Sequence, residues 1–142
     1  MDIRRSLALF GVLAVLAAGC GENPVGPGAG AEITGTWDAR FEGTVQGLGT
    51  SQIDRFVMEL RQSGASVTGT LRFNGLDLAV PVNGEIDAST FTYTARAALA
   101  PGCEAVLKAE TTVDIAGTRF SGSQTQSTCE GTAIGQVSAM RR

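Results

Sequence analysis

The chain of 142 residues contains no histidine. Histidine is the commonest general base near neutral pH and a frequent metal ligand, so its absence argues against most hydrolytic and zinc-dependent mechanisms. Lysine and arginine form no cluster and the formal net charge is −3, which argues against nucleic acid as a partner, because phosphate binding relies on grouped basic residues. The carboxylates are scattered and lack the spacing of a calcium loop. We therefore expect no enzyme activity, no cofactor and no metal site.

The first twenty residues are organised like a secretion signal. A basic head with Arg4 and Arg5 precedes an apolar run over residues 7–18. A membrane-spanning helix needs about 20 apolar residues, so a run of this length is more typical of a signal peptide. The run is followed by the small residue Gly19 and then by Cys20.

The segment Leu16-Ala17-Ala18-Gly19-Cys20 resembles the lipobox of bacterial lipoproteins, with Ala17 where leucine is more usual. The resemblance implies that residues 1–19 are removed and that Cys20 is diacylated, and two acyl chains give a stable membrane anchor. Gly21 after the cysteine implies the outer membrane by the sorting rule of enterobacteria. We expect a lipid-anchored protein of the bacterial cell envelope; the alternative is an ordinary secretory signal with a fortuitous cysteine.

Residues 20–32 separate this signal from the rest of the chain. After Cys20 they are rich in glycine and proline and have no apolar period, a composition typical of a flexible tether. Residues 33–142 remain for one domain, and they are long enough to enclose their own hydrophobic core.

Apolar and polar residues alternate with a period of two from Ile33 onward, as in strands with one buried and one exposed face. Phe56 and Met58, for example, alternate with Arg55 and Glu59, and no part of the domain shows a helical period. Turn residues divide the alternating segments into eight predicted strands: 34–43, 52–62, 65–73, 76–86, 90–99, 103–115, 118–126 and 130–140.

Short sequential connections favour an all-β fold, an eight-stranded antiparallel up-and-down β-barrel, because closure removes the exposed edges of the sheet. A β-sandwich is the alternative, although only the loop near residues 43–51 has spare length for a crossing connection. Charged residues occupy outward positions on most strands. A transmembrane barrel has an apolar outer band instead, so we reject that interpretation.

Four two-residue turns set the predicted registers: Ser63-Gly64, Asn74-Gly75, Ala88-Ser89 and Ala116-Gly117. Asn-Gly is a strong signal for a tight hairpin, and each turn keeps apolar residues on one face. In order, the turns pair Leu60 with Val67, Leu71 with Leu78, Ile86 with Phe91, and Val113 with Phe120.

The aromatic side chains of the domain share the apolar parity and are expected inside the barrel. Eight strands enclose either a filled core or room for one small ligand, and aromatic walls with a few polar groups suit a small apolar ligand. Asp54 shares the inward parity and is expected at the barrel rim. The residues predicted to line a ligand site are Trp37, Phe56, Met58, Leu71, Phe91, Tyr93 and Gln124.

The alternative is a filled barrel without a ligand, acting as a structural or protein-interaction lipoprotein. Small inward residues of the last predicted strand, such as Gly135 and Ala139, would then pack against bulky neighbours. An internal cavity favours ligand binding, whereas a packed interior with an exposed apolar patch favours a protein partner.

The segment Ile33-Thr34-Gly35-Thr36-Trp37 resembles the G-x-W opening of lipocalins and the G-T-W opening of avidin-like barrels, which are calycin-type folds. In lipocalins this tryptophan closes the barrel floor and is covered by an arginine from the far end of the chain. The resemblance implies a floor of Trp37 with Arg141 or Arg142, and we favour Arg141. Other lipocalin motifs and a C-terminal helix are absent from the sequence.

Two cysteines remain after Cys20, and we predict a disulfide between Cys103 and Cys129. An exported protein folds in an oxidising compartment, where disulfides form. The predicted register places Cys129 opposite Glu104, one residue from Cys103, and a bulge or bend at the open end of the hairpin absorbs the difference. A reactive thiol or a metal pair is disfavoured by the absence of a CxxC spacing and of a basic neighbour.

Overall fold

The computed structural model describes residues 30–142. The predicted signal 1–19, the predicted lipid site Cys20 and the first part of the predicted tether lie outside the described residues. Within residues 30–142, no helix has the length and apolarity needed to cross a membrane.

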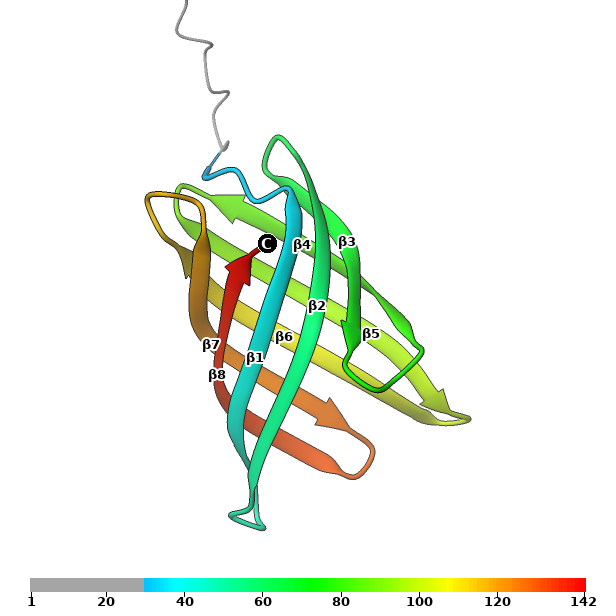
Figure 1. The fold of residues 1–142 in the computed structure, drawn as a ribbon. Coiled ribbons are helices and arrows are strands. Elements are labelled where there is room, and N and C mark those ends of the chain that lie inside the picture. Colours follow the sequence, from blue (N-terminus) through cyan, green and yellow to red (C-terminus); the bar gives the residue numbers. More distant parts are fainter. Residues whose placement is uncertain (1–29) are drawn as a thin grey trace, which may run out of the picture.

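Eight antiparallel strands in chain order close into one barrel, as the sequence predicts. β8 pairs with β1 from Trp37–Arg141 to Val45–Ala133, so the sheet has no free edge and the sandwich alternative is wrong. Figure 1 shows this up-and-down arrangement. The strands are β1 (Gly35–Val45), β2 (Ser51–Ser63), β3 (Ser66–Phe73), β4 (Ala79–Asp87), β5 (Thr90–Ala100), β6 (Cys103–Val113), β7 (Arg119–Thr128) and β8 (Gly131–Arg141).

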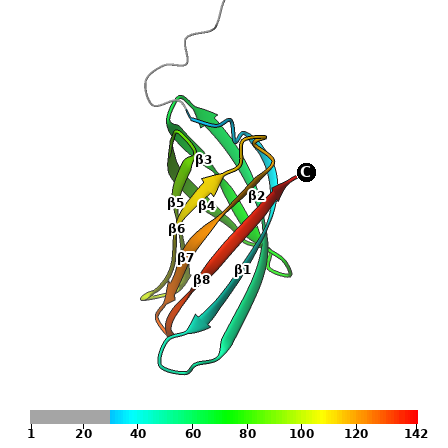
Figure 2. The ribbon, with the colours of Figure 1, turned by 90° about the vertical axis from the view of Figure 1, so that its left-hand side faces the viewer.

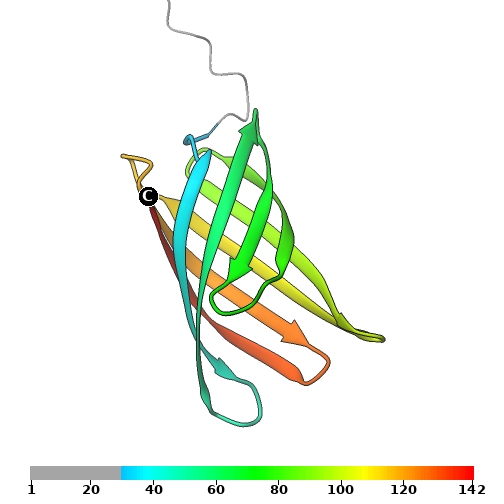
Figure 3. The same cartoon turned by 45° about the vertical axis from the view of Figure 1, so that its right-hand side comes forward.

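The two ends of the barrel hold different parts of the chain: one holds both termini of the domain and the other holds four strand connections. The chain enters at the end that holds the start of β1, and the C-terminus lies at the same end (Figure 2). The β1–β2, β3–β4, β5–β6 and β7–β8 connections lie at the opposite end (Figure 3). We call the first the closed end and the second the mouth.

The inward positions hold the apolar residues and the outward positions hold most charges. In β1, Trp37, Ala39 and Phe41 are buried while Asp38 and Arg40 are exposed, so the period of two follows the pleat. Burial of the inward row supplies the main driving force for closure.

Inward glycines allow the strands to approach closely where the barrel bends. A Cβ atom on Gly135 of β8 would collide with the carbonyl oxygen of Glu42 on β1, and one on Gly122 of β7 would collide with that of Glu110 on β6. Glycine at such positions permits the sharp curvature that closure of a small barrel requires. Gly135 is therefore inward as predicted, but it makes room for backbone rather than for a bulky side chain.

Two of the four predicted registers are correct. Ile86 pairs with Phe91, and Val113 pairs with Phe120. The Ala88-Ser89 turn forms with Ala88 at φ +52°, a left-handed conformation that is uncommon for a residue with a side chain.

The other two registers are wrong by two residues. Leu60 pairs with Gly69 rather than Val67, because Gly64 and Ala65 form the turn between Ser63 and Ser66. A shift of two residues keeps every inward side chain inward, so the alternation of the sequence does not detect it.

The β3–β4 connection is longer than predicted. Leu71 pairs with Val80 rather than Leu78, and β4 begins at Ala79 instead of residue 76. The backbone N–H of Asn74 donates to the carbonyl oxygen of Arg55 on β2 at 2.9 Å, so Asn74 extends the β2–β3 pairing. Residues 74–78 then form a loop that leaves Leu76 and Leu78 facing solvent.

Candidate ligand pocket at the barrel mouth

Trp37 and Arg141 seal the closed end. The Trp37 side chain is fully buried, and its indole Nε1–H donates to the carbonyl oxygen of Ile33 at 2.9 Å. The guanidinium carbon of Arg141 lies 4.8 Å from the centroid of the Trp37 ring, within the range of a cation–π contact. The structure thus brings together the two residues predicted for the floor.

Arg141 also ties separate segments together across this floor. Its guanidinium donates to the carbonyl oxygens of Gly117, at 2.9 Å, Glu32, at 2.6 Å, and Thr34. Arg142 has a different role, because its guanidinium pairs with the exposed carboxylate of Asp38 on the outer surface. Only Arg141 therefore covers the tryptophan.

Aromatic side chains fill the interior next to the floor. Phe120 packs against Trp37 with 4.9 Å between ring centroids, and Phe91 packs against both Phe120 and Tyr93. The Tyr93 hydroxyl donates to Oε1 of Gln124 at 2.5 Å, and burial raises the pKa of the Tyr93 phenol well above its ordinary value. This half of the barrel is a packed core.

An apolar pocket of about 200 Å³ opens at the mouth, at the other end of the barrel. One of its walls comes from β3 to β6 and from the loop before β4. The apolar side chains that form this wall include Phe73, Leu76, Leu78, Val80, Ala97, Leu99 and Leu107.

The opposite wall is polar and comes from β2 and β7. Nε2 of Gln52 donates to Oδ2 of Asp54 at 2.6 Å and to Oε1 of Gln126 at 2.9 Å, so one amide joins the two strands across the mouth. Nε2 of Gln126 is buried and donates to no atom of residues 30–142. An unpaired buried donor costs about 1–3 kcal/mol relative to a paired one, so this wall favours an acceptor.

The rim of the pocket exposes large apolar side chains. Leu76, Leu78 and Leu99 are 61%, 40% and 52% exposed, and all three line the pocket. Most other large apolar side chains of the domain point into the core. An apolar rim around an apolar pocket is the arrangement expected of a ligand entrance.

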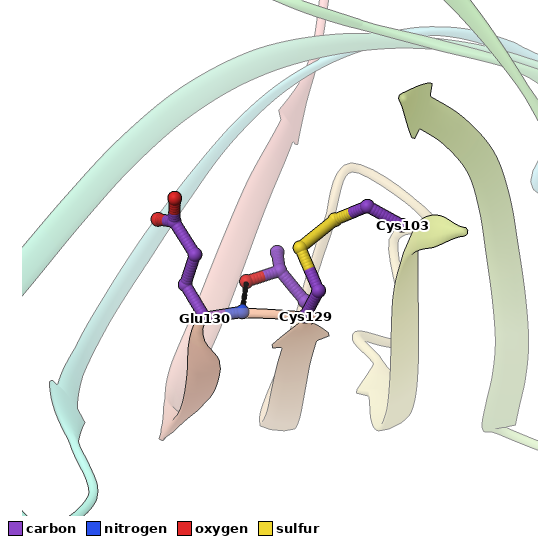
Figure 4. Close-up of a disulfide and its surroundings, with 4 residues drawn as sticks. Cys103, Cys129 and Glu130 are labelled. Atoms are coloured by element: carbon purple, nitrogen blue, oxygen red, sulfur yellow. Dashed lines mark hydrogen bonds between the residues drawn. A yellow bond between two sulfur atoms is a disulfide. The ribbon is translucent and has the colours of Figure 1, made fainter. Parts of the chain in front are cut away.

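A disulfide braces one side of the mouth. Cys103, at the start of β6, is bonded to Cys129, in the β7–β8 turn (Figure 4), which confirms the predicted pairing. The register of β5 with β6 shifts between Ala98 and Ala100, so the irregularity lies on the neighbouring strand pair. The bond holds two connections in place beside the pocket residues Ala105 and Thr128.

The residues predicted to line a ligand site are buried in the barrel, but none of them lines this pocket. Phe56, Met58 and Leu71 are core side chains below it, and Gln124 is engaged by Tyr93. Asp54 is half-buried at the rim, as expected. Gln126 has the same inward parity as Gln124 but lies one step closer to the mouth, where it lines the pocket.

Comparison of the chain with protein-family models and with curated proteins gives no match. The part of the chain from residue 30 onward contains no group of three or more potential metal-ligating side chains.

Proposed function

We propose that this protein is a lipid-anchored envelope protein that binds a small, mainly apolar ligand in the pocket at the barrel mouth. The observation that carries the proposal is the pocket itself: an apolar wall facing a polar wall that holds the unpaired donor of Gln126. The proposed role is binding rather than catalysis, and it requires no cofactor.

The size of the pocket limits the ligand. Pockets for drug-sized molecules are commonly about 300–1,000 Å³, and this pocket is about 200 Å³. The ligand is therefore a small molecule or the end of a longer chain that projects past the exposed leucines of the rim.

The alternative is a filled barrel with a structural or protein-interaction role. The packed aromatic half near Trp37 agrees with this alternative. A purely structural role, however, gives no reason for an open apolar pocket with exposed leucines at its rim. For this reason we favour ligand binding.

Lipid attachment at Cys20 sets which end of the barrel is tethered. Ala31 is held by a hydrogen bond from its N–H to the carbonyl oxygen of Ala88, and Ile33 is fully buried at the closed end. On this proposal the anchor joins the closed end, and the mouth opens on the side away from the point of attachment.

The anchor is tested by metabolic labelling with a fatty-acid analogue in a bacterial host. Replacing Cys20 with serine (C20S) removes the acylated thiol, so we expect loss of the label and loss of the membrane-bound fraction. A matched variant, C103S, removes a cysteine but keeps Cys20 and should still be labelled. Equal labelling of wild type and C20S would contradict lipidation at this residue.

Ligand binding is tested on residues 30–142, which contain the whole closed sheet and its core. Native mass spectrometry of this barrel, exported so that the disulfide forms, should show a retained small apolar mass. Ala97 lines the pocket and the next residue, Ala98, is exposed on the outside. A97F should abolish retention while A98F leaves it unchanged; retention that is unaffected by A97F would place the ligand elsewhere.

A further inference from the structure

We infer that the mouth pocket selects a neutral amphiphile, with a hydroxyl or amide head, over a carboxylate of the same chain length. This inference rests on the ligand binding proposed above and adds the chemistry of the head group. Gln126 acts as the donor to the head, and Asp54 acts as the group that rejects an anion.

The first observation is the free donor on the polar wall. Gln126 is only 8% exposed, its Oε1 already accepts from Gln52, and its Nε2 has no acceptor within residues 30–142. Because Nε2 is itself buried, a rotation of the Gln126 amide is needed to bring it to a ligand oxygen, and that contact removes the cost of an unpaired buried donor. A ligand with no acceptor leaves that cost in place.

The second observation is the uncompensated charge beside that donor. Asp54 takes part in none of the ion pairs of the described residues, and no lysine or arginine lines the pocket. Its only side-chain partner there is the Gln52 amide, on Oδ2. A second carboxylate near Asp54 would be repelled in a partly desolvated site, whereas a hydroxyl or amide both accepts a hydrogen bond and donates one.

The two walls orient such a ligand. The apolar side chains of β3 to β6 face the polar pair across a pocket of about 200 Å³. A short alkyl chain therefore packs against Val80, Ala97 and Leu107 while its head lies beside Gln126 and Asp54. A ligand with an anionic head must either approach Asp54 or turn its head to solvent and lose the Gln126 contact.

The test compares matched probes by amide NMR titration of ¹⁵N-labelled residues 30–142: 1-hexanol, hexanoate and toluene. We expect 1-hexanol to bind about tenfold more tightly than hexanoate, the ratio that a modest charge repulsion produces. D54N should reduce this ratio to about threefold or less. The control D87N removes the same charge at an exposed position at the closed end and should leave the ratio unchanged.

A second variant isolates the donor. Q126M keeps the length of the side chain but removes the amide, so it should weaken 1-hexanol about three- to tenfold, the effect of one hydrogen bond, with toluene unchanged. A well-dispersed amide spectrum shows that the variant is folded. Equal affinity of wild type for 1-hexanol and hexanoate, or unchanged 1-hexanol binding by Q126M, would overturn this inference while leaving ligand binding intact. Failure of all three probes to bind would instead refute the proposed function.

Discussion

Replacing Arg141 with methionine tests whether the floor of the barrel is held by one side chain. Methionine keeps apolar contact with Trp37 but removes the cation and its donors. The guanidinium makes three hydrogen bonds to the carbonyl oxygens of Glu32, Thr34 and Gly117 and one cation–π contact to Trp37. R141M therefore removes the hydrogen bonds that hold both the segment before β1 and the β6–β7 turn to the floor.

The size of the effect follows from these contacts. Each hydrogen bond contributes about 1 kcal/mol and the cation–π contact contributes about 1 kcal/mol. Arg141 is partly exposed, and contacts made by one side chain are not additive, so we expect R141M to lower the free energy of unfolding by about 2–4 kcal/mol. R141K should lie between R141M and wild type, since lysine keeps the charge but lacks the planar fork.

Urea unfolding followed by tryptophan fluorescence measures this loss, because Trp37 is the one tryptophan of the chain and reports directly on the floor. The neighbouring variant R142M is the matched control: its ion pair with Asp38 lies in solvent, so we expect little change. A loss below about 1 kcal/mol for R141M at unchanged m-value, or a loss no larger than that of R142M, would refute this account of the floor.

Further predictions concern the disulfide, the buried tyrosine and one turn. The double variant C103A/C129A opens a link across 26 residues and should lower the free energy of unfolding by about 3–4 kcal/mol in the chain-entropy model; a loss below about 1 kcal/mol in urea unfolding would contradict a constraining role. Burial raises the pKa of Tyr93, so the phenol stays protonated in the fold. Its stabilising contribution is present below the unfolded value of about 10 and declines at higher pH. Phenolate absorbance should therefore appear only with unfolding; phenolate that forms near pH 10 in the folded protein would show that Tyr93 is accessible. Hydrogen bonds from the backbone N–H groups of Thr118 and Arg119 lower the pKa of Asp114 below 3.8. The stability advantage of wild type over D114N should hold above that pH and shrink as the pH falls further; an advantage that is unchanged at pH 2.5 would contradict it.

Much of the fold follows from the sequence because alternation reports directly which face of a strand is buried. The residues on either side of Phe91 and of Phe120 are polar, so the alternation assigns both phenylalanines to the inward face. Closure is predicted because the first and last strands of an eight-stranded meander have no other strand with which to pair. The disulfide also follows, since the register brings Cys103 and Cys129 to the same end. The inward faces and the closure of the barrel do not need the exact pairing, whereas the disulfide depends on the register of β6 with β7, which was predicted correctly.

The exact pairing and the height of each residue in the barrel were harder to predict. Alternation repeats every two residues, so it does not distinguish Leu71–Val80 from the predicted Leu71–Leu78 pair. The strands of a barrel are also tilted, so inward parity does not give the distance from the mouth. This is why Gln124, expected beside a ligand, lies in the packed core while Gln126 lines the pocket.

The claim that the barrel is sealed at Trp37 and takes a ligand at the opposite end is tested most directly by locating a bound probe. Isotope-filtered NOE measurements on ¹³C-labelled residues 30–142 with unlabelled 1-hexanol give contacts between the probe and individual side chains. The account predicts contacts from the alkyl chain to Val80, Leu99 and Leu107, and none to Trp37. Contacts to Trp37 or Phe120, or no intermolecular contact in the presence of excess probe, would contradict it.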